Sequence, residues 1–139
     1  MPELPEVETV RRNLEATVVG RTIGSVRLSG KKLRDPISRQ LPHRLRGRRI
    51  ESVERHGKFL LIHLDQDLTL ISHLGMSGRW LFFDETQDEM LHVHAWIRFK
   101  DAPQQVGLQS AGLVHAVLAR FRCDCARLMD RPRHFSHFR

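Results

Sequence analysis

Apolar residues along the first 20 positions recur at the spacing of an amphipathic helix. Pro5 is tolerated in a first helical turn, and Gly20 is a typical residue just past a helix end. Glu8 and Arg12, four residues apart, are spaced as a stabilising ion pair on the solvent side. We therefore expect a helix between Pro5 and Gly20. Its apolar stripe is formed by Val7, Val10, Leu14 and Val18.

After residue 20 the pattern changes to short apolar runs that are typical of β-strands. A turn at His56-Gly57 is expected to pair two of these runs as a hairpin. One helix followed by many short strands predicts a mainly β (α+β) fold, an antiparallel β-sandwich with an N-terminal helix. The expected strands are Thr22–Leu28, Ile50–Glu54, Phe59–Leu64, Leu68–Leu74, Arg79–Phe83 and His92–Phe99.

Three segments have other patterns. The run His92–Phe99 alternates strictly, which predicts one apolar face and one polar face. The basic segment Ser29–Arg49 contains prolines and is expected to be irregular. We expect a helix over Ser110–Arg122. The residues that fit one face of it are Leu113, Val117 and Leu118.

The 139-residue chain has the size of one domain and an ordinary globular composition, with 40% apolar and 28% charged residues. It has no apolar run of the ~20 residues that a membrane helix needs, and its N-terminus does not resemble a signal peptide. Cys123 and Cys125 make no disulfide framework, so we expect a cytoplasmic protein. The net charge of +7 favours a polyanionic partner such as nucleic acid.

The charge pattern changes near Asp101. Residues 1–100 contain 17 Lys and Arg against 13 Asp and Glu. Residues 101–139 contain 6 Arg and 3 Asp, with neither Lys nor Glu. We therefore expect a domain over residues 1–100 and a divergent basic tail over residues 101–139.

The N-terminus is a candidate for covalent chemistry. Methionine is normally removed before a small residue such as Pro2, which leaves a secondary amine that is partly neutral at pH 7. Such an amine attacks an aldehyde and forms an iminium ion, and Glu3 or Glu6 could move protons beside it. The alternative is that Pro2 only starts the chain and that both glutamates favour a helix N-terminus electrostatically.

Two further residues could carry chemistry. Lys58 directly precedes the apolar run Phe59–Ile62. Its amine either points into a pocket or stays in water at the end of a strand. Met76 lies between Gly75 and Gly78, where it could act as an apolar wedge of the kind that DNA-bending proteins insert between bases. The alternative is a core methionine on a tight turn.

His92, His94 and Arg98 share one predicted strand face, which could meet phosphate. A metal site on that face would lack a third ligand. Near the C-terminus the cysteines and histidines do not have a usual zinc spacing, so we expect no metal there. These residues are Cys123, Cys125, His134 and His137.

The candidate residues Pro2, Glu3, Glu6, Lys58, Met76 and His92 lie in four short segments. These segments are Pro2–Arg12, Arg55–Leu61, His73–Gly78 and His92–His94. In order and spacing they closely resemble the N-terminal domain of bacterial formamidopyrimidine-DNA glycosylases. Leu4 favours this family over its endonuclease VIII relatives, which usually have Gly there. The resemblance implies a base-excision repair DNA glycosylase with AP lyase activity that acts on damaged double-stranded DNA. We expect it to act as a monomer.

The resemblance implies a role for each of six residues. Pro2 would attack C1′ of a nucleotide with an oxidised purine such as 8-oxoguanine, flipped from the duplex, and form an iminium ion. Glu3 would act as acid and base in base loss and sugar opening, and elimination would then cut the strand. Lys58 would donate a proton and contact phosphate, and Glu6 would lie near the damaged base. Met76 would fill the gap left by the flipped nucleotide, and His92 would contact the DNA.

The resemblance ends near Asp101. The family continues with an Asp-Pro-Arg-Arg-Phe-Gly loop, a helix–two-turns–helix domain and a four-cysteine zinc finger, none of which we find in residues 101–139. We therefore expect a truncated chain with no cofactor and half of a cleft. A frameshift would explain the change in composition, and the loss of a strand would leave sheet edges open.

Three functional hypotheses follow. The first is a glycosylase and AP lyase acting through Pro2, with activity reduced or lost by truncation. The second is a non-catalytic remnant or a basic DNA-binding fragment. The third is an N-terminal-proline tautomerase, whose fold begins with a strand at the proline, whereas a helical stripe follows Pro2 here.

Overall fold

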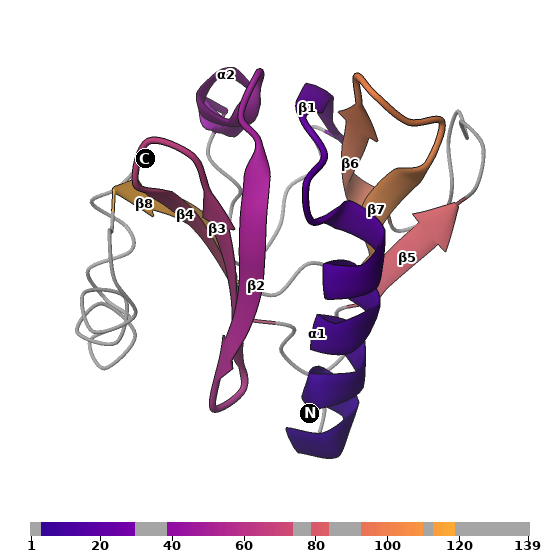
Figure 1. The fold of residues 1–139 in the computed structure, drawn as a ribbon, viewed down its shortest axis with the longest axis vertical. Helices are drawn as coiled ribbons and strands as arrows, with labels where there is room; N and C mark the ends of the chain where they lie inside the picture. Colours follow the sequence, from indigo (N-terminus) through magenta and orange to yellow (C-terminus); the bar gives the residue numbers. More distant parts are fainter. Residues whose placement is uncertain (1–3, 30–38, 74–78, 84–92, 110–112, 119–139) are drawn as a thin grey trace.

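The computed structural model describes residues 4–29, 39–73, 79–83, 93–109 and 113–118; for Leu4 and 113–118 it describes the backbone. Two four-stranded antiparallel sheets face each other as the layers of a sandwich, with α1 along one side (Figure 1). The predicted mainly β fold with an N-terminal helix is confirmed. The elements are α1 (Leu4–Val18), β1 (Ile23–Leu28), α2 (Leu41–Leu45), β2 (Ile50–His56), β3 (Phe59–Leu64), β4 (Leu68–His73), β5 (Arg79–Phe83), β6 (Val93–Phe99), β7 (Gln105–Gln109) and β8 (Leu113–Leu118).

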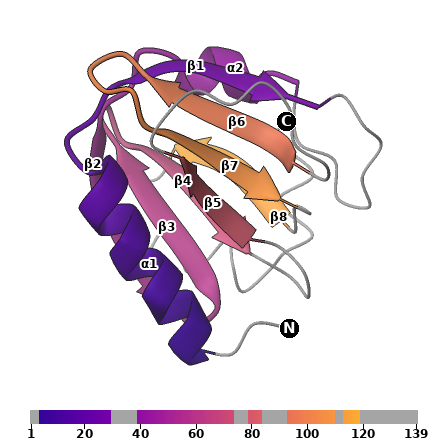
Figure 2. The same ribbon diagram turned by 90° about the vertical axis from the view of Figure 1, so that its right-hand side faces the viewer.

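The strand order is β1-β6-β7-β5 in one sheet and β2-β3-β4-β8 in the other. Figure 2 shows the first sheet in front of the second, with α1 along the edge beside β2 and β3. Apolar side chains from both sheets and both helices meet in one core, which includes Leu60 and Ile62 of β3 and Ile97 of β6. Each sheet therefore buries one face against the other.

α1 covers the side of the sandwich with a single apolar stripe, as predicted. The side chains of Val7, Leu14 and Val18 are each 1% exposed, and Val10 packs against the same core. The helix ends before Gly20, whose φ of 86° lies in the left-handed region that favours glycine. No helix in the described ranges is long and apolar enough to cross a lipid bilayer.

Two tight hairpins join β2, β3 and β4. The loop Gly57-Lys58 connects β2 to β3, and its glycine has a φ of 58° at the first central position, as in a type II′ turn. Asp65, Gln66 and Asp67 connect β3 to β4, and the φ values of Gln66 and Asp67, 56° and 61°, are those of the two central residues of a type I′ turn. The predicted pairing of the second and third expected strands is confirmed.

The basic segment Ser29–Arg49, expected to be irregular, contains the short helix α2. Leu41 and Leu45 are 3% and 0% exposed and belong to the core. Their spacing of four residues places both side chains on one face of a helix. Because they are buried against the sandwich, these residues form a helix despite the prolines and arginines around them.

The expected helix over Ser110–Arg122 is wrong in its described part, because residues 113–118 form β8 and pair with β4. The apolar run from Leu113 to Leu118 fits a strand as well as a helix face, and the open edge of β4 decides between them. β7, which was not expected, pairs with both β6 and β5. The expected loss of a strand after Asp101 is therefore wrong for the described residues.

The predicted polar face of His92–Phe99 is also wrong in the described part. β6 lies inside its sheet, and His94 and Trp96 are only 7% and 4% exposed. Gly107 on β7 leaves room for the Trp96 ring, since an added Cβ would lie 3.2 Å from it. Because β6 is buried on both faces, the alternation of apolar and polar residues along it does not distinguish a buried face from an exposed one.

We predict that Leu14→Ala lowers the free energy of unfolding by about 2–5 kcal/mol, because it removes buried methyl groups without lowering helix propensity. The matched control is Val19→Ala at the helix end, where the side chain is 38% exposed and the expected change is below about 0.5 kcal/mol. Urea denaturation followed by circular dichroism measures both. Equal effects would contradict the assignment of the buried stripe.

Candidate active site

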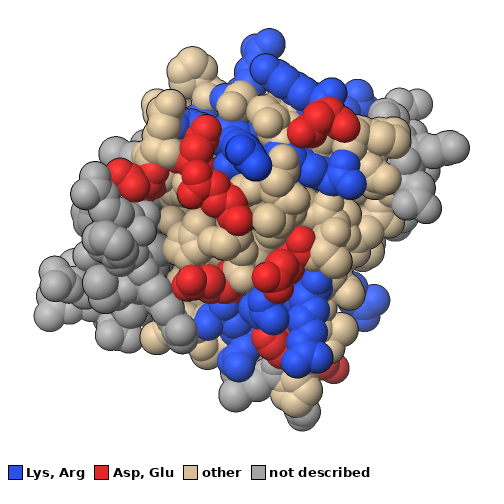
Figure 3. Space-filling model, viewed as in Figure 1, with Lys and Arg blue, Asp and Glu red and all other residues tan. Residues whose placement is uncertain are grey.

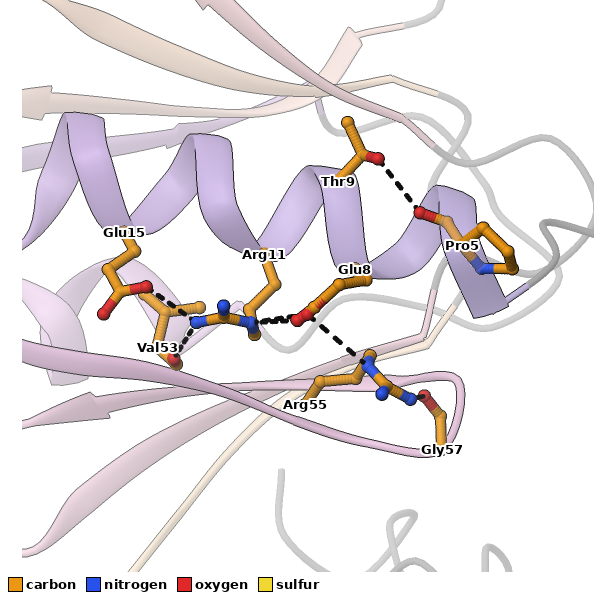
Figure 4. A network of polar contacts seen from close by, with 8 residues as sticks. All are labelled: Pro5, Glu8, Thr9, Arg11, Glu15, Val53, Arg55 and Gly57. Carbon is orange, nitrogen blue, oxygen red and sulfur yellow. Dashed lines mark hydrogen bonds and ion pairs between the residues drawn. The ribbon is translucent and has the colours of Figure 1, made fainter.

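The start of α1 lies beside the turn between β2 and β3. Arg11 Nη1 donates to the Val53 carbonyl at 3.4 Å, while Glu8, one turn earlier, contacts Arg55 further along β2 (Figure 4). The helix and the strand therefore run in opposite directions. As a result, the first turn of α1 approaches the Gly57-Lys58 turn.

Four charged side chains form a network along this contact. Arg11 Nε donates to both carboxylate oxygens of Glu8, at 2.5 and 3.0 Å, and its Nη1 donates to Glu15 Oε2 at 2.7 Å. Arg55 Nε lies 3.9 Å from Glu8 Oε2, and Arg55 Nη1 donates to the Gly57 carbonyl at 3.1 Å. The hydrogen bond from Arg11 lowers the pKa of Glu8 and raises the pKa of Arg11 itself.

The hydrogen bond from Arg11 lowers the pKa of Glu8 most, and the charge of Arg12 also lowers it, as the predicted spacing implies. Arg12 is exposed, and Glu8 instead hydrogen-bonds Arg11 on the side of the helix that faces β2. The spacing of three residues could have indicated Arg11, since i,i+3 pairs also meet on a helix. The contact with Arg55 joins residues far apart in sequence, so local spacing carries no signal for it.

Lys58 and His73 meet at the same end of the second sheet. Lys58 is half-buried in the hairpin loop, and the next residue, Phe59, pairs with His73 at the end of β4. The Phe59 and His73 rings are 4.8 Å apart at their centroids, at an angle of 64°. Burial, and then the charge of Lys58, lower the pKa of His73 and favour its neutral form. Sequence reasoning gave His73 no role, because only the strand register brings it to Lys58.

Glu6 lies in the first turn of α1 with an exposed side chain. A carboxylate there also interacts favourably with the helix dipole, so the structural alternative for Glu6 stays open. Pro2, Glu3, Met76 and His92 lie outside the described residues, and their roles remain predictions. In the sequence, Pro2 and Glu3 directly precede α1, and Met76 follows the end of β4.

His94 and Arg98 do not form the phosphate-binding face that their spacing suggested. His94 is buried, and its Nδ1 lies 3.2 Å from Ser29 Oγ. Arg98 Nε donates to Gln105 Oε1 at 3.2 Å across the sheet. Both side chains are therefore held by contacts within the fold.

Within the described ranges, no three His, Cys, Asp or Glu side chains are grouped to hold a metal ion. The C-terminal cysteines and histidines lie outside those ranges, so the expected absence of a metal stays a prediction. The residues concerned are Cys123, Cys125, His134 and His137.

A family model described as the formamidopyrimidine-DNA glycosylase N-terminal domain matches residues 1–109. The chain belongs to this family. The match continues past Asp101 through β7. The formamidopyrimidine-DNA glycosylase of Bartonella quintana is 52% identical over 85 residues, 61% of this chain. That of Halalkalibacterium halodurans is 44% identical over 106 residues, 75% of this chain.

Solved structures of the family have the same fold. Lactococcus lactis Fpg in a complex with DNA containing N7-benzyl-Fapy-dG superposes with a TM-score of 0.78 at 30% identity over 92% of this chain. The Lactococcus lactis Fpg complex with DNA containing an abasic site gives 0.79 at 28% identity over 94%. The chain spans 48% of each of those chains. It spans 29% of the Bartonella protein and 38% of the Halalkalibacterium protein.

The lowered pKa of His73 predicts a pH effect on stability. Below pH 6.5, its ordinary pKa, the unfolded chain binds a proton at this residue that the folded chain takes up only at lower pH. The contribution of His73 to the free energy of unfolding is therefore fully present above pH 6.5. It decreases as the pH falls toward the lower pKa that His73 has in the folded chain. His73→Asn should reduce the drop in melting temperature between pH 7 and about pH 5. The exposed His43→Asn is the control, and an equal reduction there would contradict the prediction.

Proposed function

We propose that this chain is the catalytic N-terminal part of a base-excision repair DNA glycosylase with AP lyase activity. Its substrate class is double-stranded DNA with an oxidised purine, such as 8-oxoguanine or a formamidopyrimidine. The family membership supports this function. The Lactococcus relatives were solved with DNA that contains a formamidopyrimidine or an abasic site, which supports the substrate class.

In the proposed reaction the Pro2 nitrogen bonds to C1′ of the damaged nucleotide and the bond from C1′ to the base breaks. Glu3 transfers protons as the base departs and the sugar ring opens, which leaves an iminium ion between Pro2 and C1′. The iminium makes the C2′ proton acidic. Loss of that proton expels the 3′ phosphate, and a second elimination expels the 5′ phosphate. Hydrolysis of the iminium returns the free amine.

The other proposed residues act on the DNA around this centre. Lys58 donates a proton and contacts phosphate, and Glu6 lies near the damaged base. Met76 fills the gap left by the flipped nucleotide, and His92 contacts the DNA. Because the nucleophile is part of the chain, we propose that the reaction needs no bound metal or cofactor.

The observation that carries the proposal is the meeting of three chain segments at one end of the second sheet. α1, which follows Pro2 and Glu3, approaches the Gly57-Lys58 turn through the Glu8–Arg55 contact. β4 ends at His73, whose pKa is lowered in part by the charge of Lys58. These segments carry three of the four motifs of the family resemblance.

The charge distribution supports a DNA partner. In Figure 3, Lys and Arg side chains gather toward the lower end of the view, where α1 begins, and in a second group at the top. The chain as a whole has a net charge of +7. Basic side chains around a reaction centre attract a phosphate backbone and align it without reading sequence.

The main alternative is a DNA-binding fragment without turnover. A tautomerase is disfavoured because residues from Leu4 onward form a helix, whereas that fold begins with a strand at the proline. Binding without covalent trapping would distinguish the fragment from the enzyme.

We predict that borohydride traps this chain covalently on a duplex that contains an abasic site, because reduction converts the iminium into a stable amine. Pro2→Gly keeps only a primary amine at the N-terminus and should lower the adduct yield strongly, and Lys58→Gln should lower it by about tenfold or more. Denaturing gels measure the adduct, after mass spectrometry has confirmed removal of Met1. A chelator should leave the yield unchanged.

Pro5→Ala is the matched control, since it replaces a proline three residues later that lies within α1. It should keep the adduct. An adduct yield in Pro2→Gly equal to that of the unaltered chain would contradict the assignment of the nucleophile. A folded chain without Met1 that binds the duplex but gives no adduct would favour the DNA-binding fragment.

A further inference from the structure

Two charged residues link the start of α1 to the turn that carries Lys58. Glu8 Oε2 lies 3.9 Å from Arg55 Nε, and Arg55 Nη1 donates to the Gly57 carbonyl at 3.1 Å (Figure 4). The carbonyl carbon of Gly57 is bonded to the backbone nitrogen of Lys58. The link therefore runs from the second turn of the helix to the residue next to Lys58.

Apolar packing alone constrains the start of α1 weakly. Among the described side chains of residues 5–11, Val7 is the one that is fully buried. Apolar burial is non-directional, whereas an ion pair draws two particular groups together; the Glu8–Arg55 pair does so at 3.9 Å, without a hydrogen bond from Arg55 Nε. Glu8 therefore adds a specific contact near the start of α1, one turn closer to Pro2 and Glu3 than the contact of Arg11 with Val53.

The surroundings of Glu8 keep this link charged. The side chains of Glu8, Arg11 and Arg55 are 26%, 22% and 33% exposed, so the contact is partly shielded from solvent ions. The hydrogen bond from Arg11 lowers the pKa of Glu8, so the carboxylate stays ionised to a lower pH than an ordinary glutamate. Arg11 also ties the same helix to β2 through the Val53 carbonyl.

We propose that Glu8, acting through Arg55, is a positioning residue for the reaction and sets the separation between the helix that follows Pro2 and the turn that carries Lys58. This inference rests on the proposed function. A displacement of about 1 Å between reacting groups can lower a rate about 100-fold. Loss of the link should therefore slow the chemical step while the DNA is still bound.

The test separates rate from affinity. Glu8→Gln, Arg55→Gln and the double variant are compared with the unaltered chain by single-turnover borohydride trapping on an abasic duplex. The dissociation constant is measured separately for a duplex with a tetrahydrofuran analogue of the abasic site. Each single change should lower the trapping rate by about tenfold and change the dissociation constant by less than about threefold. The double variant should be no slower than the slower single variant, because both changes break one link.

Glu15→Gln is the matched control. Glu15 accepts a hydrogen bond from the same Arg11 at 2.7 Å, but it lies two turns further from the start of α1. Its loss should leave the trapping rate within about twofold. Amide hydrogen exchange of β3 and β4 checks that every variant keeps the core.

A Glu8→Gln rate equal to that of the unaltered chain overturns the inference. The inference is also overturned if the rate reductions of the two single variants multiply in the double variant. An equal reduction of the trapping rate in Glu15→Gln overturns it as well. In each of these cases the unaltered chain still forms the adduct, so the proposed function stands. Absence of the adduct in the unaltered chain overturns both.

Discussion

Two sheets can bury their facing apolar sides only when the gap between them is also closed at its margins. α1 closes one margin, because Val7, Leu14 and Val18 share a core with residues of both sheets. α2 does the same beside β1 and β8 with Leu41 and Leu45. This requirement fixes α1 against the edge of β2, and the first turn of α1 is thereby placed at one end of the sandwich.

Apolar burial decides that α1 docks here, and charge decides how its first turns are oriented. The stripe of the helix would tolerate a small shift along β2, since apolar contacts have no preferred direction. The contacts of Arg11 with Val53, at 3.4 Å, and of Glu8 with Arg55, at 3.9 Å, favour one position of the helix along β2. Of the proposed site residues that the structure describes, Glu6 lies in the first turn of α1 and Lys58 lies in the tight turn between β2 and β3, so both are carried by or directly joined to rigid elements.

The described residues after Asp101, 102–109 and 113–118, belong to the architecture of the sandwich. β7 lies between β6 and β5, so the described part of β5 would have no strand partner without it. β8 lies beyond the family match and still pairs with β4 along its whole length. Ladder hydrogen bonds are made by the backbone, so an open sheet edge accepts any run of residues that is compatible with a strand.

The sequence alone determined the elements whose signals are local. The spacing of Val7, Leu14 and Val18 predicted α1, and the glycine at position 57 predicted the β2–β3 hairpin, because helix period and turn geometry depend on near neighbours. The motifs around Pro2, Lys58 and Met76 indicated the family. Tertiary structure decided the strand conformation of residues 113–118, the burial of His94, and the meeting of Glu8 with Arg55 and of His73 with Lys58. Each of these depends on pairing between distant segments, and the sequence of one segment does not specify which surface it will meet.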